Sequence, residues 1–353
     1  MTNKIRIALV GCGRISEKHF QAVKGLPDLQ LVGVCDTNKE LAEKKAHEQG
    51  CKAFTDYETM LVTLKPDIVS ICTPNFLHPV QTILAAQKKI NVITEKPMAL
   101  TLKDARNMIN ACKKNNVHLF VIKQNRYNPP IQKLKEAIDK GRFGKIYLGS
   151  ICVRWQRPQE YYDQDNWHGT LLKDGGTLLN QASHHVDMLQ WLLGPAQSVS
   201  GIAARLGRKI ETEDTAISLI TFKNGALGII EATTLTHPRN LEGSITIQGE
   251  KGTVKVGGTA LNKIDIWEFK DNDPDDENIK NIGTNPPNVY GFGHSEVYKN
   301  VRDCLLRNGK NHVNGEEGYK TLELIMAIHK ASREGKQVTI PLGEEEGVHL
   351  NRF

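Results

Sequence analysis

Two glycines and a serine, Gly11, Gly13 and Ser16, follow an apolar run near the start of the chain and precede a helical pattern. This spacing is typical of a phosphate-binding turn, in which the first glycine permits the tight turn and the second lets the backbone approach a pyrophosphate. The N-terminus of the next helix adds N–H donors and the positive end of a dipole. Ser16 replaces a third glycine, so we expect slightly looser helix–strand packing. Arg14 and Ile15 are expected to contact the cofactor.

A carboxylate, Asp36, ends the next apolar run, about twenty residues after the turn. At this position an acid accepts hydrogen bonds from the adenosine ribose hydroxyls and repels a 2′-phosphate, so the sequence predicts NAD rather than NADP as cofactor. On these residues alone one alternative stays open, because a methyltransferase also combines a glycine turn with a ribose-binding acid.

Five polar side chains come directly after two later predicted strands. They are Thr73, Asn75 and His78 after one strand, and Glu95 and Lys96 after the next. In doubly wound sheets, ligands bind outside the carboxyl ends of the strands, so we expect all five to line the cofactor crevice.

Lys96 can take part in proton chemistry at this edge of the sheet. When an alcohol gives a hydride to NAD, one group must remove the hydroxyl proton, and a cation must stabilise the charge that develops on oxygen. We expect Lys96 beside the nicotinamide in that role. The alternative is a surface lysine ahead of a proline turn.

The elements that position these residues alternate between strands and helices. Strands are predicted over 4–10, 29–35, 67–72, 91–94 and 118–122, and helices over 15–26, 39–49, 78–88 and 104–115, with Asn38 capping one helix. Alternation of this kind predicts an α/β fold with a doubly wound parallel sheet. Because Asn128-Pro129-Pro130 breaks the pattern and starts a new helix, we expect residues 1–124 to form an NAD-binding Rossmann domain.

The remainder, residues 125–353, has a different character. Strand-like runs over 145–155, 215–222, 226–234 and 242–248 follow one another without helices, and Gly225 and 249–252 resemble hairpin turns. A polar loop is expected over 271–287, helices over 295–306 and 316–333, and a short strand over 338–341. This predicts an α+β domain with a mostly antiparallel sheet that binds substrate.

Composition disfavours several classes of function. A chain of 353 residues favours two domains. The net charge of +6 is spread among acidic residues, which argues against nucleic-acid binding but suits a polyanionic small substrate. The seven cysteines have no metal-site spacing, so we expect no metal. With no apolar run near ~18 residues and no signal-peptide pattern at the start, the expected compartment is the cytoplasm.

Three motifs together resemble a known family. Thr73-Pro74, Glu95-Lys96-Pro97 and the run Gly175–Asp187 (GGTLLNQASHHVD) are similar to those of the glucose–fructose oxidoreductase/inositol dehydrogenase/MocA family, and the resemblance covers nearly the whole chain. It implies a Rossmann domain followed by an open-faced sheet that serves substrate and oligomer contacts. Such sheets usually pair face to face, which implies a homotetramer.

Five short segments narrow the resemblance to the UDP-N-acetyl-glucosaminuronate 3-dehydrogenases. They are Val121–Arg126, Arg157–Asp163, Trp167–Thr170, Asn180–His184 and Tyr290–His294. The resemblance implies NAD-dependent oxidation of the C3 hydroxyl of UDP-2-acetamido-2-deoxy-D-glucuronate. The 3-keto sugar then feeds an aminotransferase in bacterial surface-polysaccharide (lipopolysaccharide) synthesis. Some relatives reoxidise the bound cofactor with 2-oxoglutarate.

A helix predicted over 178–193 places Asn180, His184 and Asp187 on one face, at positions i, i+4 and i+7. The resemblance implies that His184 is a proton shuttle or base and that His185 is a core residue. The wider family often has aspartate where this chain has Asn180. Because an amide cannot take a proton, the base is His184 or Lys96, while Asn180 hydrogen-bonds the sugar or orients Lys96.

The implied substrate carries a diphosphate and a carboxylate, which need donors and stacking surfaces. Arginines suit the anionic groups because the guanidinium binds carboxylate and phosphate with two parallel hydrogen bonds. The candidate substrate-binding residues, besides Lys96, Asn180 and His184, are Asn125, Arg126, Arg154, Arg157, Tyr161, Tyr162, Trp167 and Gln181. Gln124 is expected to face the nicotinamide or the substrate. The alternative for each of these residues is an ordinary surface position, packed or solvated, without a ligand.

Two other functions are compatible with the same residues. One is an NAD-dependent dehydrogenase of a free polyol or another sugar, similar to inositol dehydrogenase. The other is a non-catalytic sensor that binds NAD on a Rossmann scaffold. The presence of both Lys96 and His184 counts against the sensor.

Overall fold

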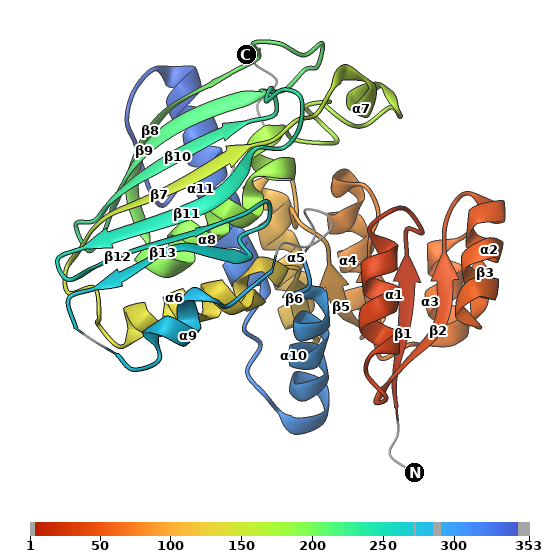
Figure 1. Ribbon diagram of the computed structural model, residues 1–353. Helices are drawn as coiled ribbons and strands as arrows, with labels where there is room; N and C mark the ends of the chain where they lie inside the picture. The colour runs from red at the N-terminus through yellow and green to blue at the C-terminus, as the bar shows by residue number, and fades with distance from the viewer. Residues whose placement is uncertain (1–3, 272, 285–290, 345–353) are drawn as a thin grey trace. The chain divides into compact units, whose positions relative to one another are not determined.

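The computed structural model describes residues 4–271, 273–284 and 291–344, which fall into two compact units (Figure 1). Unit 1 comprises the described residues up to Ile122 together with His294–Lys320, and unit 2 comprises those of 123–293 and from Thr321 onward. The expected domains were 1–124 and 125–353. The structure revises them, because residues 294–320 belong with the Rossmann unit.

Unit 1 is built on a sheet of six parallel strands in the order β3-β2-β1-β4-β5-β6. The strands are β1 (Ile5–Val10), β2 (Leu29–Cys35), β3 (Lys52–Phe54), β4 (Ile68–Ile71), β5 (Asn91–Thr94) and β6 (Leu119–Val121). The order reverses between β1 and β4, which is where doubly wound sheets bind ligands. The predicted doubly wound parallel sheet is confirmed.

Three helices of unit 1 begin at a side-chain cap. Asn38 accepts a hydrogen bond from Leu41 N–H and starts α2, as predicted. Asp56 and Thr101 cap α3 and α5 in the same way. The helices are α1 (Ser16–Lys24), α2 (Lys39–Gln49), α3 (Tyr57–Leu64), α4 (His78–Gln87), α5 (Leu102–Lys114) and α10 (His294–Arg307), with a 3₁₀ turn at Asn75–Leu77.

Unit 2 contains an eight-stranded sheet in the order β13-β12-β11-β7-β10-β9-β8-β14, in which only β7 and β10 pair in parallel among the described strands. The strands are β7 (Ile146–Arg154), β8 (Ala196–Ala204), β9 (Thr215–Phe222), β10 (Leu227–Thr233), β11 (Glu242–Gly249), β12 (Gly252–Gly257), β13 (Lys263–Phe269) and β14 (Val338–Thr339). The mostly antiparallel sheet is confirmed, although β8, β12 and β13 were not predicted.

In the described part of the chain, helices lie on one face of this sheet and leave the other face open (Figure 1). Helix α8 (Ser183–Leu193) packs on β7 and β11. Along β9, Ile220 and Phe222 are buried, whereas Ile217 and Leu219 on the opposite face are 55% and 61% exposed. The remaining helices of this part are α6 (Pro129–Asp139), α7 (Gln159–Asp163), α9 (Asp276–Lys280) and α11 (Gly315–Glu334), which starts in unit 1, and a 3₁₀ turn spans Gln124–Tyr127.

Two expectations for unit 2 are wrong in detail. The segment expected to be a loop over 271–287 contains α9, because the Arg142 guanidinium binds the carboxylates of Asp271 and Asp276 and holds the segment in place. The single helix expected over 178–193 is a π-helix, Thr177–Gln181, followed by α8. The change of winding breaks the i, i+4, i+7 face that was predicted for Asn180, His184 and Asp187.

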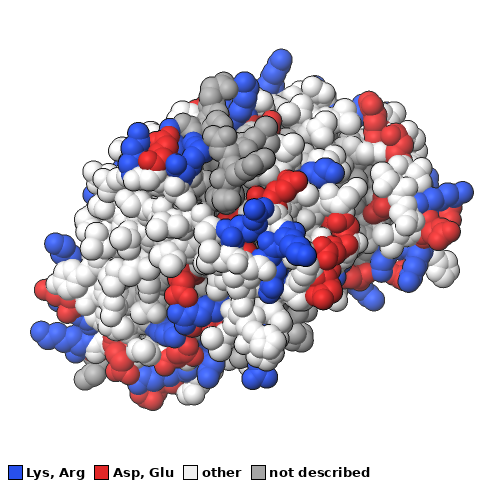
Figure 2. All heavy atoms as spheres, turned by 90° about the horizontal axis from the view of Figure 1, so that it is seen from above, with Lys and Arg blue, Asp and Glu red and all other residues white. Residues whose placement is uncertain are grey.

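On the face shown in Figure 2, Lys and Arg side chains are interspersed with Asp and Glu side chains. Among the described residues, no helix combines the length and the apolar character that a membrane crossing requires.

Candidate functional site

The glycine turn between β1 and α1 has the geometry of a phosphate cradle. Gly11 has a φ of +91°, and a Cβ there would lie 2.6 Å from the carbonyl carbon of Cys72, so only glycine fits. At Gly13 the position of a Cβ has no described atom within 4 Å, so the backbone faces open space. A pyrophosphate can therefore approach the backbone at Gly13 and the N-terminus of α1.

Ser16 replaces the third glycine without opening the turn. Its side chain is buried, and its hydroxyl donates a 2.7 Å hydrogen bond to the Gly13 carbonyl. This hydrogen bond joins two residues of the turn itself, so the looser helix–strand packing stays a prediction. Arg14 is exposed in the turn, whereas Ile15 packs against the core cluster around Leu9 and Phe20.

Asp36 lies directly against this turn. One carboxylate oxygen accepts a 2.8 Å hydrogen bond from the Cys12 N–H, and the other accepts a 2.9 Å hydrogen bond from the Asn38 N–H. The side chain is half-buried and directly follows the end of β2. This placement fits a carboxylate that accepts hydrogen bonds from the ribose hydroxyls of NAD.

Replacing Asp36 by alanine is expected to raise the Kd for NAD about ten- to a hundredfold, the effect of losing hydrogen bonds to a charged group. The Kd for NADP should rise less or fall, because the charge that repels a 2′-phosphate is gone. Fluorescence titration with both dinucleotides measures the two values, with Glu40→Ala on the exposed side of α2 as the control. An unchanged NAD/NADP ratio would contradict the assigned role of Asp36.

His78 holds loops together rather than facing a ligand. Its ring is buried, with Nδ1 2.8 Å from the Pro97 carbonyl oxygen and Nε2 2.9 Å from the Thr73 carbonyl oxygen. Burial lowers its pKa. We therefore reassign His78 from the cofactor to the positioning of two strand-end loops. Thr73 bonds Gln81 through its hydroxyl at 2.6 Å, and Asn75 is buried at the start of the 3₁₀ turn.

Glu95 also has buried partners that the sequence did not reveal. One oxygen contacts Nε2 of His19 at 3.0 Å and Nε2 of His294 at 3.4 Å. Nδ1 of His19 lies 2.9 Å from the Tyr298 hydroxyl and 2.8 Å from the Ser70 hydroxyl. Burial opposes ionisation of Glu95, but the two histidines outweigh it and hold its pKa well below the usual range.

This network, which we call the His19–Glu95 network, takes Glu95 away from direct cofactor contact. The ligand atoms of His19, Glu95 and His294 lie within 4.8 Å of one another, a spacing that could hold a metal ion. Hydrogen bonds among these groups account for their arrangement without an ion. The other Glu95 oxygen accepts a 3.1 Å hydrogen bond from the Lys96 N–H, so the network fixes the backbone from which the half-buried Lys96 side chain extends.

In unit 2, Gln124 lies against His184. Its Nε2 is 3.0 Å from Nε2 of the His184 ring, and both side chains are buried. Asn125, next along the chain, is buried too, and its Oδ1 is a buried atom without a hydrogen-bond partner among the described residues. Gly293 packs on the backbone of Gln124, where a Cβ would collide with the carbonyl. Gly293 belongs to the Tyr290–His294 segment of the sequence analysis, of which Tyr290 lies outside the described residues.

Arg126 was predicted to bind substrate, but its guanidinium is buried and forms an ion pair with Asp187. Nε and Nη2 donate to the two carboxylate oxygens at 2.9 and 2.8 Å. The Lys123 ammonium is 2.8 Å from the same carboxylate, and the Thr321 hydroxyl donates to it at 2.8 Å. The guanidinium also stacks 5.1 Å from the Trp191 ring. We therefore assign Arg126 to a buried ion cluster.

Arg154 was also predicted to bind substrate, and it too has partners in the structure. Its guanidinium bonds Glu231 at 2.6 and 2.7 Å and Glu242 at 3.2 Å, on the face of the sheet opposite the helices. These are cross-strand ion pairs, because β7 lies between β10 and β11. The substrate role predicted for Arg154 is replaced by this one.

The π-helix positions the polar residues that follow the Gly175-Gly176 pair. Asn180 donates a hydrogen bond through Nδ2 to the carboxylate of Asp174, and Gln181 donates one of 3.0 Å to the Tyr161 hydroxyl. A Cβ at Gly176, which has a φ of +97°, would collide with the Glu213 carboxylate. Asp174 and Glu213 were missed in the sequence, because nothing local marks them as partners of this turn.

The aromatic residues around α7 form a half-buried patch beside Arg157. The Arg157 guanidinium lies 5.1 Å from the Trp155 ring and 5.4 Å from the Tyr161 ring, and it donates to the Gln156 carbonyl at 2.7 Å. Tyr162 is buried and donates to the Thr234 hydroxyl at 3.1 Å. Burial raises the pKa of Tyr162 to about 12. Trp167 stacks on His168 with 3.8 Å between ring centres.

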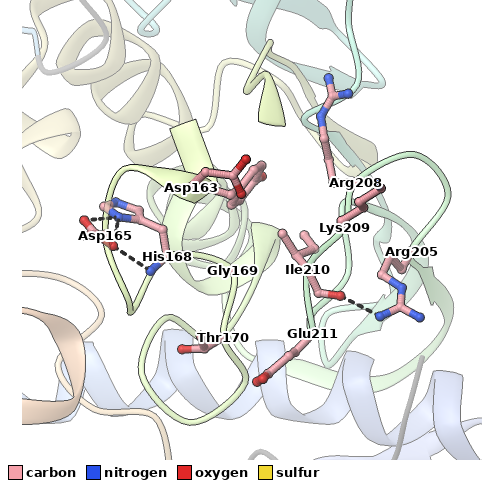
Figure 3. Close-up of a pocket in the computed structure, with 11 residues that line it drawn as sticks. Asp163, Asp165, His168, Gly169, Thr170, Arg205, Arg208, Lys209, Ile210 and Glu211 are labelled. Atoms are coloured by element: carbon pink, nitrogen blue, oxygen red, sulfur yellow. Dashed lines mark hydrogen bonds and ion pairs between the residues drawn. The ribbon is translucent and has the colours of Figure 1, made fainter. Parts of the chain in front are cut away.

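A pocket of about 670 Å³ opens next to this patch (Figure 3). Its size is within the range of ligand sites. The residues that line it come from the segment 162–170 and from the turn 205–211, which the sequence did not single out. Three of them are cations, Arg205, Arg208 and Lys209, and the pocket also has acidic side chains such as Asp163 and Glu211.

A glycine turn with the geometry of a phosphate cradle and an acid after the next strand, joined in one chain to an open-faced sheet, fit an NAD-binding oxidoreductase. Family models agree over most of the chain: residues 5–123 match the NAD-binding Rossmann fold of an oxidoreductase family, and residues 135–340 match its C-terminal alpha/beta domain. The chain belongs to the glucose–fructose oxidoreductase/inositol dehydrogenase/MocA family.

Relatives and solved structures narrow the class. The WlbA dehydrogenase of Bordetella pertussis, solved with NADH and UDP-GlcNAcA, is 44% identical with a TM-score of 0.90, over 96% of this chain and 100% of that one. The WlbA dehydrogenase of Chromobacterium violaceum, with the same ligands, is 44% identical with a TM-score of 0.91, over 97% of each chain. D-glucoside 3-dehydrogenase of Escherichia coli is 29% identical over 96% of this chain and 98% of its own length. The protein is an NAD-dependent sugar dehydrogenase.

Proposed function

We propose that this enzyme oxidises the C3 hydroxyl of UDP-2-acetamido-2-deoxy-D-glucuronate with NAD, in the cytoplasm, for bacterial surface-polysaccharide synthesis. The observation that carries the proposal is the 44% identity, over nearly the full length, to two dehydrogenases solved with NADH and UDP-GlcNAcA. The five sequence segments that resemble enzymes of this specificity support it. The diphosphate and the carboxylate of such a substrate also suit the net charge of +6.

We assign the proton chemistry to Lys96 and His184. The Gly11–Ser16 turn and Asp36 would hold the NAD, which accepts the hydride when bound. Lys96 extends from the carboxyl end of β5, where its ammonium can stabilise the oxygen of the sugar hydroxyl. His184, buried beside Gln124, is the base or shuttle that takes the hydroxyl proton. Asn180 supplies a hydrogen bond to the sugar.

For substrate binding we retain a smaller set than the sequence suggested. Because Arg126 and Arg154 have buried or cross-strand acidic partners, they leave this set. Those retained are Asn125, Arg157, Tyr161, Tyr162, Trp167 and Gln181. The cations Arg205, Arg208 and Lys209 join them, because they line the pocket next to the aromatic patch.

A second function, oxidation of a free sugar, is favoured by the curated relatives. Besides D-glucoside 3-dehydrogenase, D-apiose dehydrogenase of Paraburkholderia graminis is 26% identical over 96% of this chain. A free sugar has no diphosphate, so this function would leave the cations of the pocket without a ligand role.

Adding UDP-2-acetamido-2-deoxy-D-glucuronate to the purified protein with NAD is expected to produce the NADH absorbance band. Parallel samples receive D-apiose, a methyl glucoside or myo-inositol, and should show no comparable band. Adding 2-oxoglutarate afterwards should remove the band if the enzyme recycles its cofactor in this way. A band with a free sugar and none with the nucleotide sugar would replace the proposal with the second function.

We further propose that the open face of the sheet is an oligomer contact and that the enzyme is a homotetramer. Large apolar side chains on neighbouring strands are exposed there, including Ile217, Leu219 and Leu227. A contiguous apolar patch on a sheet face is typical of a protein–protein contact.

A further inference from the structure

The side-chain amide of Asn180 has a carboxylate partner. Its Nδ2 donates a hydrogen bond to Oδ1 of Asp174, six residues earlier in the chain. Asp174 is only 2% exposed. A buried carboxylate that accepts from a neighbouring amide is a strong, charge-assisted contact, so it restricts the Asn180 side chain.

This contact determines which end of the amide points away from Asp174. An ionised carboxylate only accepts hydrogen bonds, so the nitrogen of Asn180 must face it and the oxygen must face the opposite way. Amide orientation is usually ambiguous by shape alone, but here the partner decides it. Asn180 therefore presents a hydrogen-bond acceptor on its other side.

Asp174 is itself held in place by the backbone around it. Its second oxygen accepts a 2.9 Å hydrogen bond from the Gly169 N–H, and its own N–H donates to the Thr170 carbonyl at 3.0 Å. After Gly176, the Leu178 N–H donates to the Glu213 carboxylate at 2.8 Å and holds the start of the π-helix. The donor and the acceptor of the Asp174–Asn180 contact thus both sit on a fixed backbone.

We propose that Asp174 is a positioning residue that orients Asn180, so that the amide oxygen accepts a hydrogen bond from the reacting sugar hydroxyl. The inference rests on the proposed function in one respect, because Asn180 must contact the substrate. Asp174 touches neither substrate nor cofactor in this role. It acts by fixing which atom of the Asn180 amide, the oxygen or the nitrogen, faces the sugar hydroxyl.

Exchanging the two side chains tests the inference. Asp174→Asn removes the acceptor that selects the amide orientation, so kcat should fall about ten- to a hundredfold, as expected when a substrate-positioning group is misplaced. Asn180→Asp places two carboxylates in contact, so the pKa of one of them should rise above the usual range. The double variant Asp174→Asn/Asn180→Asp restores an amide–carboxylate pair and should recover most of the lost activity.

The pH profile separates positioning from a merely structural role. In Asn180→Asp, the pH dependence of kcat/KM should show one ionisation that the unaltered enzyme lacks. In the double variant, the pKa of this ionisation should return toward the ordinary carboxyl range. Melting temperatures of all three variants show whether they fold, and Asp265→Asn, an exposed carboxylate on β13, is the control. Activity and a pH profile of Asp174→Asn equal to those of the unaltered enzyme would overturn the inference.

A wrong assignment of the substrate would give a different result from a wrong assignment of Asp174. In that case the unaltered enzyme does not oxidise UDP-2-acetamido-2-deoxy-D-glucuronate, and the same variants are assayed with the sugar that it does oxidise. Independently of substrate, carboxyl-carbon NMR of Asn180→Asp should show one carboxyl that titrates well above the usual range and a return toward normal in the double variant. Two carboxyls that titrate normally in Asn180→Asp would also refute the pairing.

Discussion

Lys96→Met is expected to lower kcat about a thousandfold, within the range that general acid–base groups contribute, and to leave the Kd for NAD nearly unchanged. Methionine has a similar length but no charge and no proton to exchange. The backbone of residue 96 should stay in place, because its N–H is held by Glu95 in the His19–Glu95 network. Steady-state kinetics with the nucleotide sugar and fluorescence titration with NAD give the two quantities.

Two further variants make the test specific. Lys24→Met removes an exposed lysine at the end of α1 and should have the kinetics of the unaltered enzyme. His184→Asn should lower kcat by a comparable factor and remove one ionisation from the pH profile. If Lys96→Met turned over substrate at the normal rate, Lys96 would have no part in proton transfer or charge stabilisation.

Asp187→Asn is expected to lower the free energy of unfolding by about 3–5 kcal/mol, the typical loss when one partner of a buried ion pair is removed. The substitution leaves Arg126 and Lys123 with positive charges that are almost fully buried, and an amide cannot compensate for both. Urea unfolding followed by circular dichroism measures the change.

The pH dependence of this loss has a defined sign. Burial opposes ionisation of Asp187, but Arg126 and Lys123 outweigh it and hold the pKa of the carboxyl well below its usual range. Its stabilising contribution is therefore complete above the unfolded pKa of about 3.9 and is lost as the pH falls through the folded pKa. The stability difference between Asp187→Asn and the unaltered protein should be constant near neutrality and shrink in acid.

The control for this series is Asp139→Asn, which alters an exposed partner of Lys135 on α6 and should change stability by less than about 1 kcal/mol. A loss of that small size for Asp187→Asn as well would mean that the cluster contributes little. A difference that grew in acid would mean that Asp187 does not ionise in the folded protein.

The fold was predictable where burial imposes a local pattern. The bounds of β2, β5 and β9 agree with the sequence to the residue, because the apolar or alternating residues of these strands are bounded by polar turns. Strand β3 has three residues, none of them buried, so no apolar run marked it. The π-helix was unpredictable for another reason, since the Glu213 carboxylate that holds its start is distant in sequence.

For the candidate site, the sequence allowed proposals only where the chemistry is local. Gly11, Gly13 and Asp36 could be named because the chemistry of a dinucleotide turn is local and its spacing is fixed. Arg126 and Arg154 looked equally suitable for an anion, but their partners, Asp187 and Glu231, come from elements far along the chain. Residue type shows what a side chain can bind, whereas the fold determines whether the side chain is already paired with a neighbour.

The His19–Glu95 network has a consequence for how the protein is made. A nascent chain that ends at Ile122 contains all six strands of the Rossmann sheet, yet it lacks His294 and Tyr298 of α10. In such a chain Glu95 has His19 but not its second histidine, and Ser70 lacks the tyrosine hydroxyl. Although domains generally fold from the N-terminus during synthesis, this unit is completed only after the ribosome has also translated residues 123–293, which belong to unit 2. Synthesis thus delays the completion of unit 1 until most of unit 2 has been made.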